Sequence, residues 1–394
     1  MRIAIVACGS RGDVQPMLAL ALGIKAAGHD AFVCSSPENA DRIRGFDCAF
    51  EALGEPIHGN PELHATGVRA FNRFIRRQVA IQVRDLPRLV EGCDLVLASG
   101  LVFGVRPVAQ HLGIPYRYVA FSPATILGTT RDSPIVHLLG SVTGLVADWA
   151  YGAAVDEGRR SLGLPRRRGV MGQMIGIDPI AATDPALTVL PAGARLRATQ
   201  TGYMVLPSRD PLSDDLHRFL DAGPPPLYAG FGSMPLGNAE RLSRVLVEAA
   251  HATGQRLVVC RGWAELPDVA RAEDCLFVGD EPHDLLFPLV AVVIHHGGAG
   301  TVATAARAGV PQIVLPQAAD QFLWRRQVVG LGLGPKAPMM RTVSAQALTR
   351  AVARVLADPA YGRRAATVAA ELQAAGDGVA ATVTAATDLV APQT

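Results

Sequence analysis

Short apolar runs, many of them β-branched, alternate along most of the chain with longer stretches rich in alanine and leucine. Runs that stay apolar without strict alternation are typical of strands in a parallel sheet that is covered on both faces. The stretches between them are long enough for helices, so the pattern indicates repeated βαβ units. Strands are predicted at residues 3–7, 31–34, 95–98, 116–121, 188–190, 227–231, 257–260, 276–278, 292–294 and 313–315.

The βαβ pattern occurs twice, and each half opens with a strand, a glycine-rich turn and a helix, at residues 3–27 and 227–253. Between the halves, residues 207–226 contain five prolines and several charged residues, which is typical of a stiff connector. We therefore predict an α/β protein with two doubly wound, Rossmann-like parallel-sheet domains that face each other across a cleft. The predicted parts are residues 1–206, the linker 207–226, residues 227–378 and a tail over 379–394.

Charge and cysteine content exclude several classes of protein. Lys and Arg number 37 and Asp and Glu 35, which leaves a net charge of +2 and argues against a nucleic-acid-binding protein. The six cysteines show no C-x-x-C spacing, so a metal site, a redox motif or a disulfide scaffold is not indicated.

Membrane and export signals are also missing from the sequence. The apolar run at residues 3–8 is too short for a signal peptide. The most membrane-like stretch, residues 135–155, is interrupted by His137 and Asp148, and we interpret it as a buried helix. We expect a cytoplasmic protein without integral membrane contact.

The segment with the clearest chemical meaning is residues 292–301, Val-Val-Ile-His-His-Gly-Gly-Ala-Gly-Thr. Its glycines, Gly297, Gly298 and Gly300, allow a ligand to approach the backbone, and the N–H groups at the start of the following helix attract anions. His296 and Thr301 add side-chain donors. The pattern predicts a cradle for a diphosphate, and the alternative is a tight turn whose histidines are merely solvated.

Two further positions extend this interpretation. Ser233 follows the first strand of the second half and would either bond the same phosphates or cap a helix. Asp320 and Gln321 would either chelate vicinal sugar hydroxyls or cap the next helix. No G-x-G-x-x-G follows the first strand and no P-loop pattern is found, which disfavours a nicotinamide dehydrogenase and an ATPase.

The order Gly-Phe-Gly-Ser, His-His-Gly-Gly-Ala-Gly-Thr and Gly-Val-Pro-Gln…Ala-Asp-Gln resembles the nucleotide-sugar-dependent glycosyltransferases of family 1, which have the GT-B fold. The opening motif, residues 8–16, is similar to the bacterial antibiotic-tailoring branch and to sterol glucosyltransferases. The resemblance implies an acceptor domain at residues 1–206, a nucleotide-sugar donor domain at 227–378 and a tail that crosses back to the first domain. It is weakest over residues 55–90 and 122–200, where such enzymes shape the acceptor pocket.

The resemblance also implies roles for individual residues of this chain. The resemblance assigns the donor diphosphate to the turn of His296 and to Ser233, and the donor sugar to Asp320 and Gln321. It assigns the base to Arg261, Trp263 and Val278. Where plant members carry a Glu that clamps both ribose hydroxyls, this chain has Thr304, which favours a dTDP-sugar over a UDP-sugar.

Asp13 is the predicted catalytic base, because the antibiotic branch places an Asp in the same motif. The N-terminal loop Gly9, Ser10, Arg11 and Gly12 would aim it into the cleft, where it would take the proton of an acceptor hydroxyl. The structural alternative is a helix cap. The implied reaction is a single inverting displacement onto a lipophilic natural-product hydroxyl. It would need no metal and no cofactor beyond the nucleotide-sugar.

Other functions remain open at this point. A sterol glucosyltransferase using UDP-glucose is the nearest alternative among transferases, and a 2-epimerase of the same fold would need no acceptor. A non-catalytic nucleotide-sugar-binding partner is the alternative from another class. The expected partners are a small-molecule acceptor and donor, with no nucleic acid, and the protein would be a monomer or homodimer.

Overall fold

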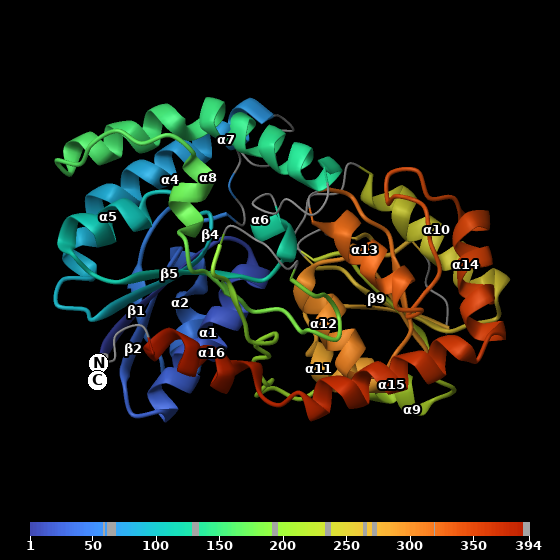
Figure 1. The fold of residues 1–394 in the computed structure, drawn as a ribbon. Helices are drawn as coiled ribbons and strands as arrows, with labels where there is room; N and C mark the ends of the chain where they lie inside the picture. The colour runs from blue at the N-terminus through green and yellow to red at the C-terminus, as the bar shows by residue number, and fades with distance from the viewer. Residues whose placement is uncertain are drawn as a thin grey trace. The chain divides into compact units, whose positions relative to one another are not determined.

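The protein forms two compact units in a computed structural model (Figure 1). The structure describes residues 1–57, 60, 68–127, 134–190, 196–232, 238–262, 266–269, 274–318 and 320–388. One unit comprises Met1–Leu206 and Asp377–Thr394, and the other comprises Pro207–Gly376. The chain therefore passes from one unit to the other twice.

The first unit is built on a parallel sheet with the strand order β3-β2-β1-β4-β5-β6-β7. Its strands are β1 (Arg2–Cys8), β2 (Asp30–Ser35), β3 (Ala49–Ala52), β4 (Leu95–Gly100), β5 (Tyr116–Ala120), β6 (Ile180–Ala181) and β7 (Thr199–Gln200). Residues 3–7 of β1 are buried without interruption, as the continuous apolar run predicts for a central strand covered on both faces.

Helices cover this sheet. They are α1 (Arg11–Ala26), α2 (Ala40–Gly45), α4 (Val68–Leu89), α5 (Val105–Leu112), α6 (Pro123–Leu127), α7 (Pro134–Ser161), α8 (Val170–Ile175) and α16 (Gly378–Thr387), with a short 3-10 turn at Pro37–Asn39. Figure 1 shows α16, in red, beside α1. The contact is close, because a Cβ on Gly23 would lie 2.3 Å from a methyl group of Val379. The guanidinium of Arg117 also donates to the carbonyl of Ala385.

The second unit has a parallel sheet with the order β10-β9-β8-β11-β12. Its strands are β8 (Leu227–Gly230), β9 (Leu257–Cys260), β10 (Cys275–Val278), β11 (Val292–His295) and β12 (Gln312–Val314). Its helices are α9 (Asp214–Asp221), α10 (Ala239–Ala252), α11 (His283–Leu286), α12 (Ala299–Arg307), α13 (Gln321–Gly330), α14 (Ala345–Ala357) and α15 (Ala360–Ala374), with a 3-10 turn at Phe287–Leu289. The predicted α/β fold class with two parallel-sheet domains is confirmed.

One predicted strand is wrong. Residues 188–190 form no strand, and the sheet is instead extended by β6 and β7, which have two residues each. The carbonyl of Thr188 accepts a hydrogen bond from the side chain of Gln200, at 2.8 Å. A side-chain amide therefore uses a backbone acceptor that a strand would offer to a neighbouring strand.

The segment expected to act as a connector contributes to a core. Within it, Ser213 precedes α9, and its hydroxyl donates to Glu281 at 2.5 Å. Leu212 and Leu216 are buried in an apolar cluster of the second unit. The prolines bracket a short amphipathic helix, so only part of residues 207–226 is extended chain.

Helix α7 differs from the expected buried helix over residues 135–155. Ala147, Ala150 and Val155 are buried, but Trp149 is 78% exposed and Leu145 69% exposed. Over residues 144–161, whose side chains the structure describes, apolar residues therefore lie on both faces of the helix, and only one face packs. In the part of the chain that the structure describes, no helix combines the length and apolar character needed to cross a membrane.

Candidate active site

The turn after β11 is shaped from inside by His295. Its side chain is fully buried; Nδ1 accepts from the Gly297 N–H at 3.1 Å, and Nε2 lies 3.0 Å from the Gln312 amide oxygen. Because Nδ1 accepts, Nε2 carries the proton and donates to Gln312. Burial, together with the neighbouring His296, lowers the pKa of His295 to about 3. A neutral His295 therefore has a structural role in the turn.

Glycine is required at position 297, two residues after His295. Gly297 has φ +96, and a Cβ there would lie 2.8 Å from a methyl group of Val314. Gly298 is the N-cap of α12 and extended, with φ −65 and ψ 141. No acidic residue lies in the first turn of α12, where helix geometry gives the N–H groups of Ala299, Gly300 and Thr301 no acceptor within the helix. The turn thus presents a positive helix end.

His296 lies between two glycine turns. A Cβ on Gly232 would lie 2.9 Å from its Cε1, and one on Gly298 would lie 2.6 Å from its Nε2. The imidazole ring therefore fits only because neither position carries a side chain. Its Nδ1 is buried and has no hydrogen-bond partner among the described residues. Burial lowers the pKa of His296 to about 4, so the ring is neutral at pH 7. A buried nitrogen without a partner fits a ligand oxygen better than a solvated turn.

The two residues predicted to contact the donor sugar also organise the loop around them. Asp320 precedes α13, and its Oδ2 accepts from the indole N–H of Trp324 at 3.3 Å. Gln321 is buried, and its amide oxygen accepts from the backbone N–H groups of Gln317 and Ala318. Asp320 is the N-cap residue of α13 but makes no side-chain cap hydrogen bond, so these side chains hold the loop and Trp324 rather than cap the helix. Their sugar contact stays a prediction.

The residues predicted to hold the base lie at the carboxyl ends of β9 and β10. The Arg261 N–H donates to the carbonyl of Val278 at 3.0 Å, and its guanidinium donates to the carbonyl of Phe277 at 2.8 Å. The guanidinium also lies over the Phe277 ring, 5.7 Å from its centre. Arg261 and Val278 are thus brought together. Trp263 and Ser233 lie outside the described residues.

In the first unit, Asp13 is at the third position of α1, and Ser10 is the N-cap. The Ser10 N–H donates to Oδ2 of Asp13 at 2.8 Å, and the two side chains form a capping box. A Cβ on Gly9 would lie 2.1 Å from the same oxygen, so only glycine lets the carboxylate fold back over the loop. Asp13 is therefore not the N-cap residue itself, which is Ser10, but its carboxylate takes part in capping α1. This contact does not exclude a second role for the carboxylate.

Asp13 lies at the carboxyl edge of the first sheet. The Cβ that Gly100 lacks would lie 3.5 Å from the Cβ of Asp13, and the Tyr118 hydroxyl donates to the Gly100 carbonyl at 3.3 Å. Burial, assisted by the charge of Asp13, raises the pKa of Tyr118 and that of Cys8, the latter to about 12. Tyr118 is a neighbour that the sequence analysis missed, because it comes from a strand far along the chain.

A narrow pocket adjoins this loop. It is lined by residues of β1 and of the segments around it, namely Cys8, Gly9, Ser36, Leu53, Glu55, Ile57, Phe74, Gln78 and Leu101. Glu55 is held by an ion pair with Arg77 at 3.0 Å. The resemblance implies an acceptor region broadly at residues 55–90 and 122–200, but the sequence pattern carries no signal for these individual side chains.

Solved structures with the same architecture establish the fold. The glycosyltransferase of kitacinnamycin has a TM-score of 0.76 at 20% identity, over 97% of each chain. The Streptomyces sp. SF2575 glycosyltransferase SsfS6, solved in complex with thymidine diphosphate, has a TM-score of 0.65 at 21% identity, over 98% of each chain. The two parallel-sheet units therefore define a protein with the GT-B fold.

Sequence relatives establish the family. Residues 3–128 match the glycosyltransferase family 28 N-terminal domain, and residues 246–385 match the erythromycin biosynthesis protein CIII-like C-terminal domain. Vancomycin aglycone glucosyltransferase of Amycolatopsis orientalis is 38% identical over 97% of this chain and 96% of its own. The dTDP-epi-vancosaminyltransferase of the same organism is 34% identical over 85% of each.

The protein belongs to this family of vancomycin-type glycosyltransferases, and it is a glycosyltransferase enzyme. The resemblance inferred from the histidine–glycine turn and the opening motif is thereby confirmed. The roles assigned to individual site residues remain predictions.

Proposed function

We propose that this enzyme transfers a sugar from a dTDP-sugar to a hydroxyl of a lipophilic natural-product aglycone, with inversion and without a metal. The observation that carries the proposal is the turn at residues 296–301. There a neutral histidine, whose buried Nδ1 has no hydrogen-bond partner in the described part of the chain, lies beside a helix N-terminus that has no acidic residue of its own. Such a site suits a leaving diphosphate, whose charge grows as the reaction proceeds.

The proposed step is one displacement. The acceptor oxygen forms a bond to the anomeric carbon, the bond from that carbon to the diphosphate breaks, and the acceptor proton moves to Asp13. Attack from the side opposite the leaving group inverts the anomeric centre. The N–H groups of α12 and the His296 ring stabilise the departing charge, which is the task a divalent metal performs in other transferases.

The donor and acceptor classes are supported by the residues and by the relatives. Thr304 stands where plant members clamp both ribose hydroxyls with a Glu, so a deoxyribose suits this site. One relative is named for a dTDP-linked sugar and another for the vancomycin aglycone. We extend both classes to this chain as part of the proposal.

The first experiment is a thermal-shift panel with thymidine diphosphate, uridine diphosphate and NAD, run on the wild type and on His296→Ala. A ligand that binds only the folded state raises Tm by mass action. We expect the largest shift with thymidine diphosphate and a reduced shift in the variant. A shift with NAD alone would overturn the proposal.

Turnover then tests the reaction itself. dTDP-sugars and UDP-glucose are offered with a glycopeptide aglycone, a polyketide aglycone and a sterol, and product linkage is read by NMR. We expect inverted linkage to an aglycone, with kcat unchanged in excess EDTA. Transfer to the sterol alone, from UDP-glucose, would favour the alternative function.

A further inference from the structure

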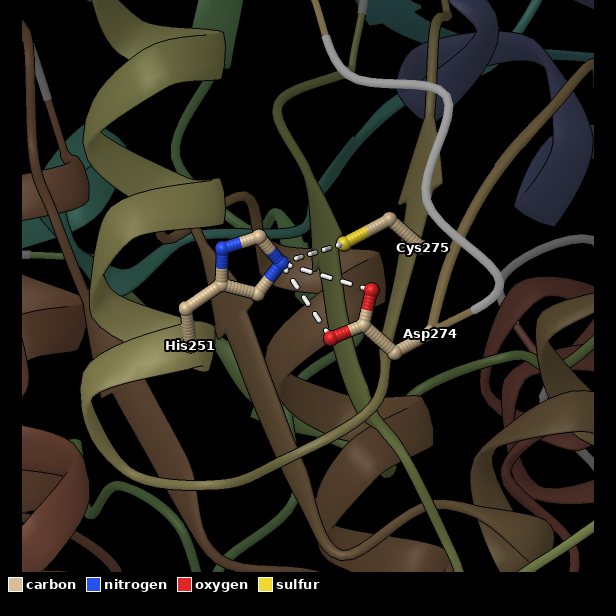
Figure 2. A group of neighbouring side chains, drawn as sticks. All are labelled: His251, Asp274 and Cys275. Carbon is tan, nitrogen blue, oxygen red and sulfur yellow. Dashed lines mark hydrogen bonds and ion pairs between the residues drawn. The ribbon is translucent and has the colours of Figure 1, made fainter.

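Three side chains of types that can bind metals lie close together in the second unit. They lie at the opposite end of β10 from the residues predicted to hold the nucleotide base. His251 is in the last turn of α10, Asp274 immediately precedes β10, and Cys275 is the first residue of β10. Figure 2 shows the three pointing toward one another, with Nε2 of His251 facing both the carboxylate and the sulfur.

The spacing of the three groups fits a tetrahedral ion. Nε2 of His251 lies 3.2 Å from Oδ2 of Asp274 and 3.8 Å from Sγ of Cys275, and all three ligand atoms lie within 4.8 Å of one another. Bonds of about 2.0 Å to nitrogen and oxygen and about 2.3 Å to sulfur imply ligand–ligand edges of roughly 3.3–3.5 Å in a tetrahedron. The two distances from His251, to Asp274 and to Cys275, are within a few tenths of an ångström of these edges.

We propose that His251, Asp274 and Cys275 bind a divalent zinc-class ion. A fourth ligand would be water, because the group borders an open hollow lined also by Gly254, Gln255 and Arg256. The Arg256 guanidinium is directed elsewhere: it donates to the Pro224 carbonyl at 2.9 Å and lies 4.1 Å from the centre of the Phe219 ring.

Charge and access favour such an ion over a hard one. A thiolate and a carboxylate balance the charge of a divalent cation, and nitrogen with sulfur is the ligand set of zinc rather than of magnesium or calcium. His251 and Asp274 have side chains 46% and 44% exposed, so an ion reaches the site from solvent. On binding, the Cys275 thiol loses its proton to solvent and His251 coordinates as the neutral imidazole.

The position predicts a structural role rather than a catalytic one. Ligands of open parallel sheets bind at the carboxyl ends of strands, whereas Cys275 begins its strand. The ion would fasten the end of α10 to the start of β10. The sugar-transfer step is therefore independent of this site, and failure of the proposal would leave the proposed function untouched.

The test is metal-dependent thermal stability of the full chain, first stripped with a chelator and then titrated with zinc or magnesium. At a hundredfold excess over Kd, zinc is expected to raise the Tm by roughly 5–10 °C. Cys275→Ser and His251→Ala should lose this shift. His217→Ala removes an exposed histidine of the same unit and should keep it.

Cobalt identifies the sulfur ligand directly. We expect a thiolate-to-cobalt charge-transfer band in the wild type that is absent in Cys275→Ser and retained in His217→Ala. Because each variant is compared with itself with and without metal, a loss of stability from the substitution does not obscure the result. Equal zinc shifts in all variants, an equal shift with magnesium, or no cobalt–thiolate band would overturn the proposal.

Discussion

The turns after β1 and β11 lead a central parallel strand into a helix in each unit, but they treat the start of that helix differently. In the first unit, the carboxylate of Asp13 folds back and accepts from the Ser10 N–H. In the second, α12 begins at a glycine N-cap, has no acidic residue in its first turn, and lies beside a buried histidine nitrogen without a described partner.

The difference separates two uses of the same geometry. A helix N-terminus attracts negative charge, and α1 supplies that charge from its own sequence. Helix α12 supplies none from its own first turn, so its N-terminus is suited to an external anion. The first turn is thus suited to positioning a carboxylate, and the second to receiving a diphosphate.

The largest expected effect comes from Asp13→Asn. Asparagine keeps an oxygen that accepts from Ser10 but cannot take a proton, so kcat should fall by about 10²–10⁴-fold. Thymidine diphosphate binding should be unchanged, since the diphosphate is expected at the other turn. Steady-state kinetics and calorimetry measure the two; turnover within about threefold of wild type would refute the base assignment.

A negative charge in the first turn of α12 would give this helix what α1 already has, an acidic side chain at its N-terminus. Thr301→Glu should weaken thymidine diphosphate binding about 10–100-fold relative to Thr301→Gln, through like-charge repulsion close to the phosphates. Both variants lack the hydroxyl, so their difference isolates the charge. Equal dissociation constants for the two would show that the diphosphate binds elsewhere.

A smaller effect is expected on the stability of the folded protein in acid, through His296 in the turn after β11. The pKa of His296 is lowered by burial to about 4, against about 6.5 for an unfolded histidine. Between these values the unfolded chain binds a proton that the folded chain does not, so stability falls as the pH falls from about 6.5 to 4. His296→Asn should reduce this loss by on the order of 1–2 kcal/mol, since partial exposure of the ring screens the shift.

Urea unfolding across that pH range measures this effect. His295 contributes in the same direction, because burial lowers its pKa to about 3. Some acid sensitivity should therefore persist in His296→Asn. A variant as acid-sensitive as the wild type would show that His296 is not desolvated.

The smallest effect belongs to the cap of α1. Ser10→Ala removes one side-chain member of the capping box and should cost about 0.5–1 kcal/mol, a decrease of roughly 1–4 °C in Tm. Asp13 keeps its bond to the Ser10 backbone N–H, which the substitution does not remove. Turnover should stay close to wild type, and a large loss would indicate that the Ser10 hydroxyl contributes to catalysis, either at the substrate or through its own hydrogen bond to Oδ2 of Asp13, at 3.2 Å.

The geometry of the turn at residues 296–301 was predictable because the contacts that shape it are mostly local. Gly297, Gly298 and His296 are adjacent in sequence, and each is explained by a contact within the turn or with one neighbouring strand. The role of His295 was not predictable, because it depends on Gln312 from the next strand. Its burial as a neutral ring follows only from tertiary packing.

Features formed by distant residues escaped the sequence analysis. Strands β6 and β7 have two residues each, too few for a pattern. The exposed Trp149 of α7 lies in an apolar run that does not reveal which face packs. The His251 group joins residues 23 positions apart without a spaced cysteine motif.

The return of α16 to the first unit has a consequence for synthesis on the ribosome. Residues Pro207–Gly376 form a contiguous unit that emerges complete while the first unit still lacks its last helix. Until α16 arrives, the space beside Gly23 and the guanidinium of Arg117 have no Val379 or Ala385 to contact. The packing of the first unit is therefore completed only after all of the second unit has been synthesised.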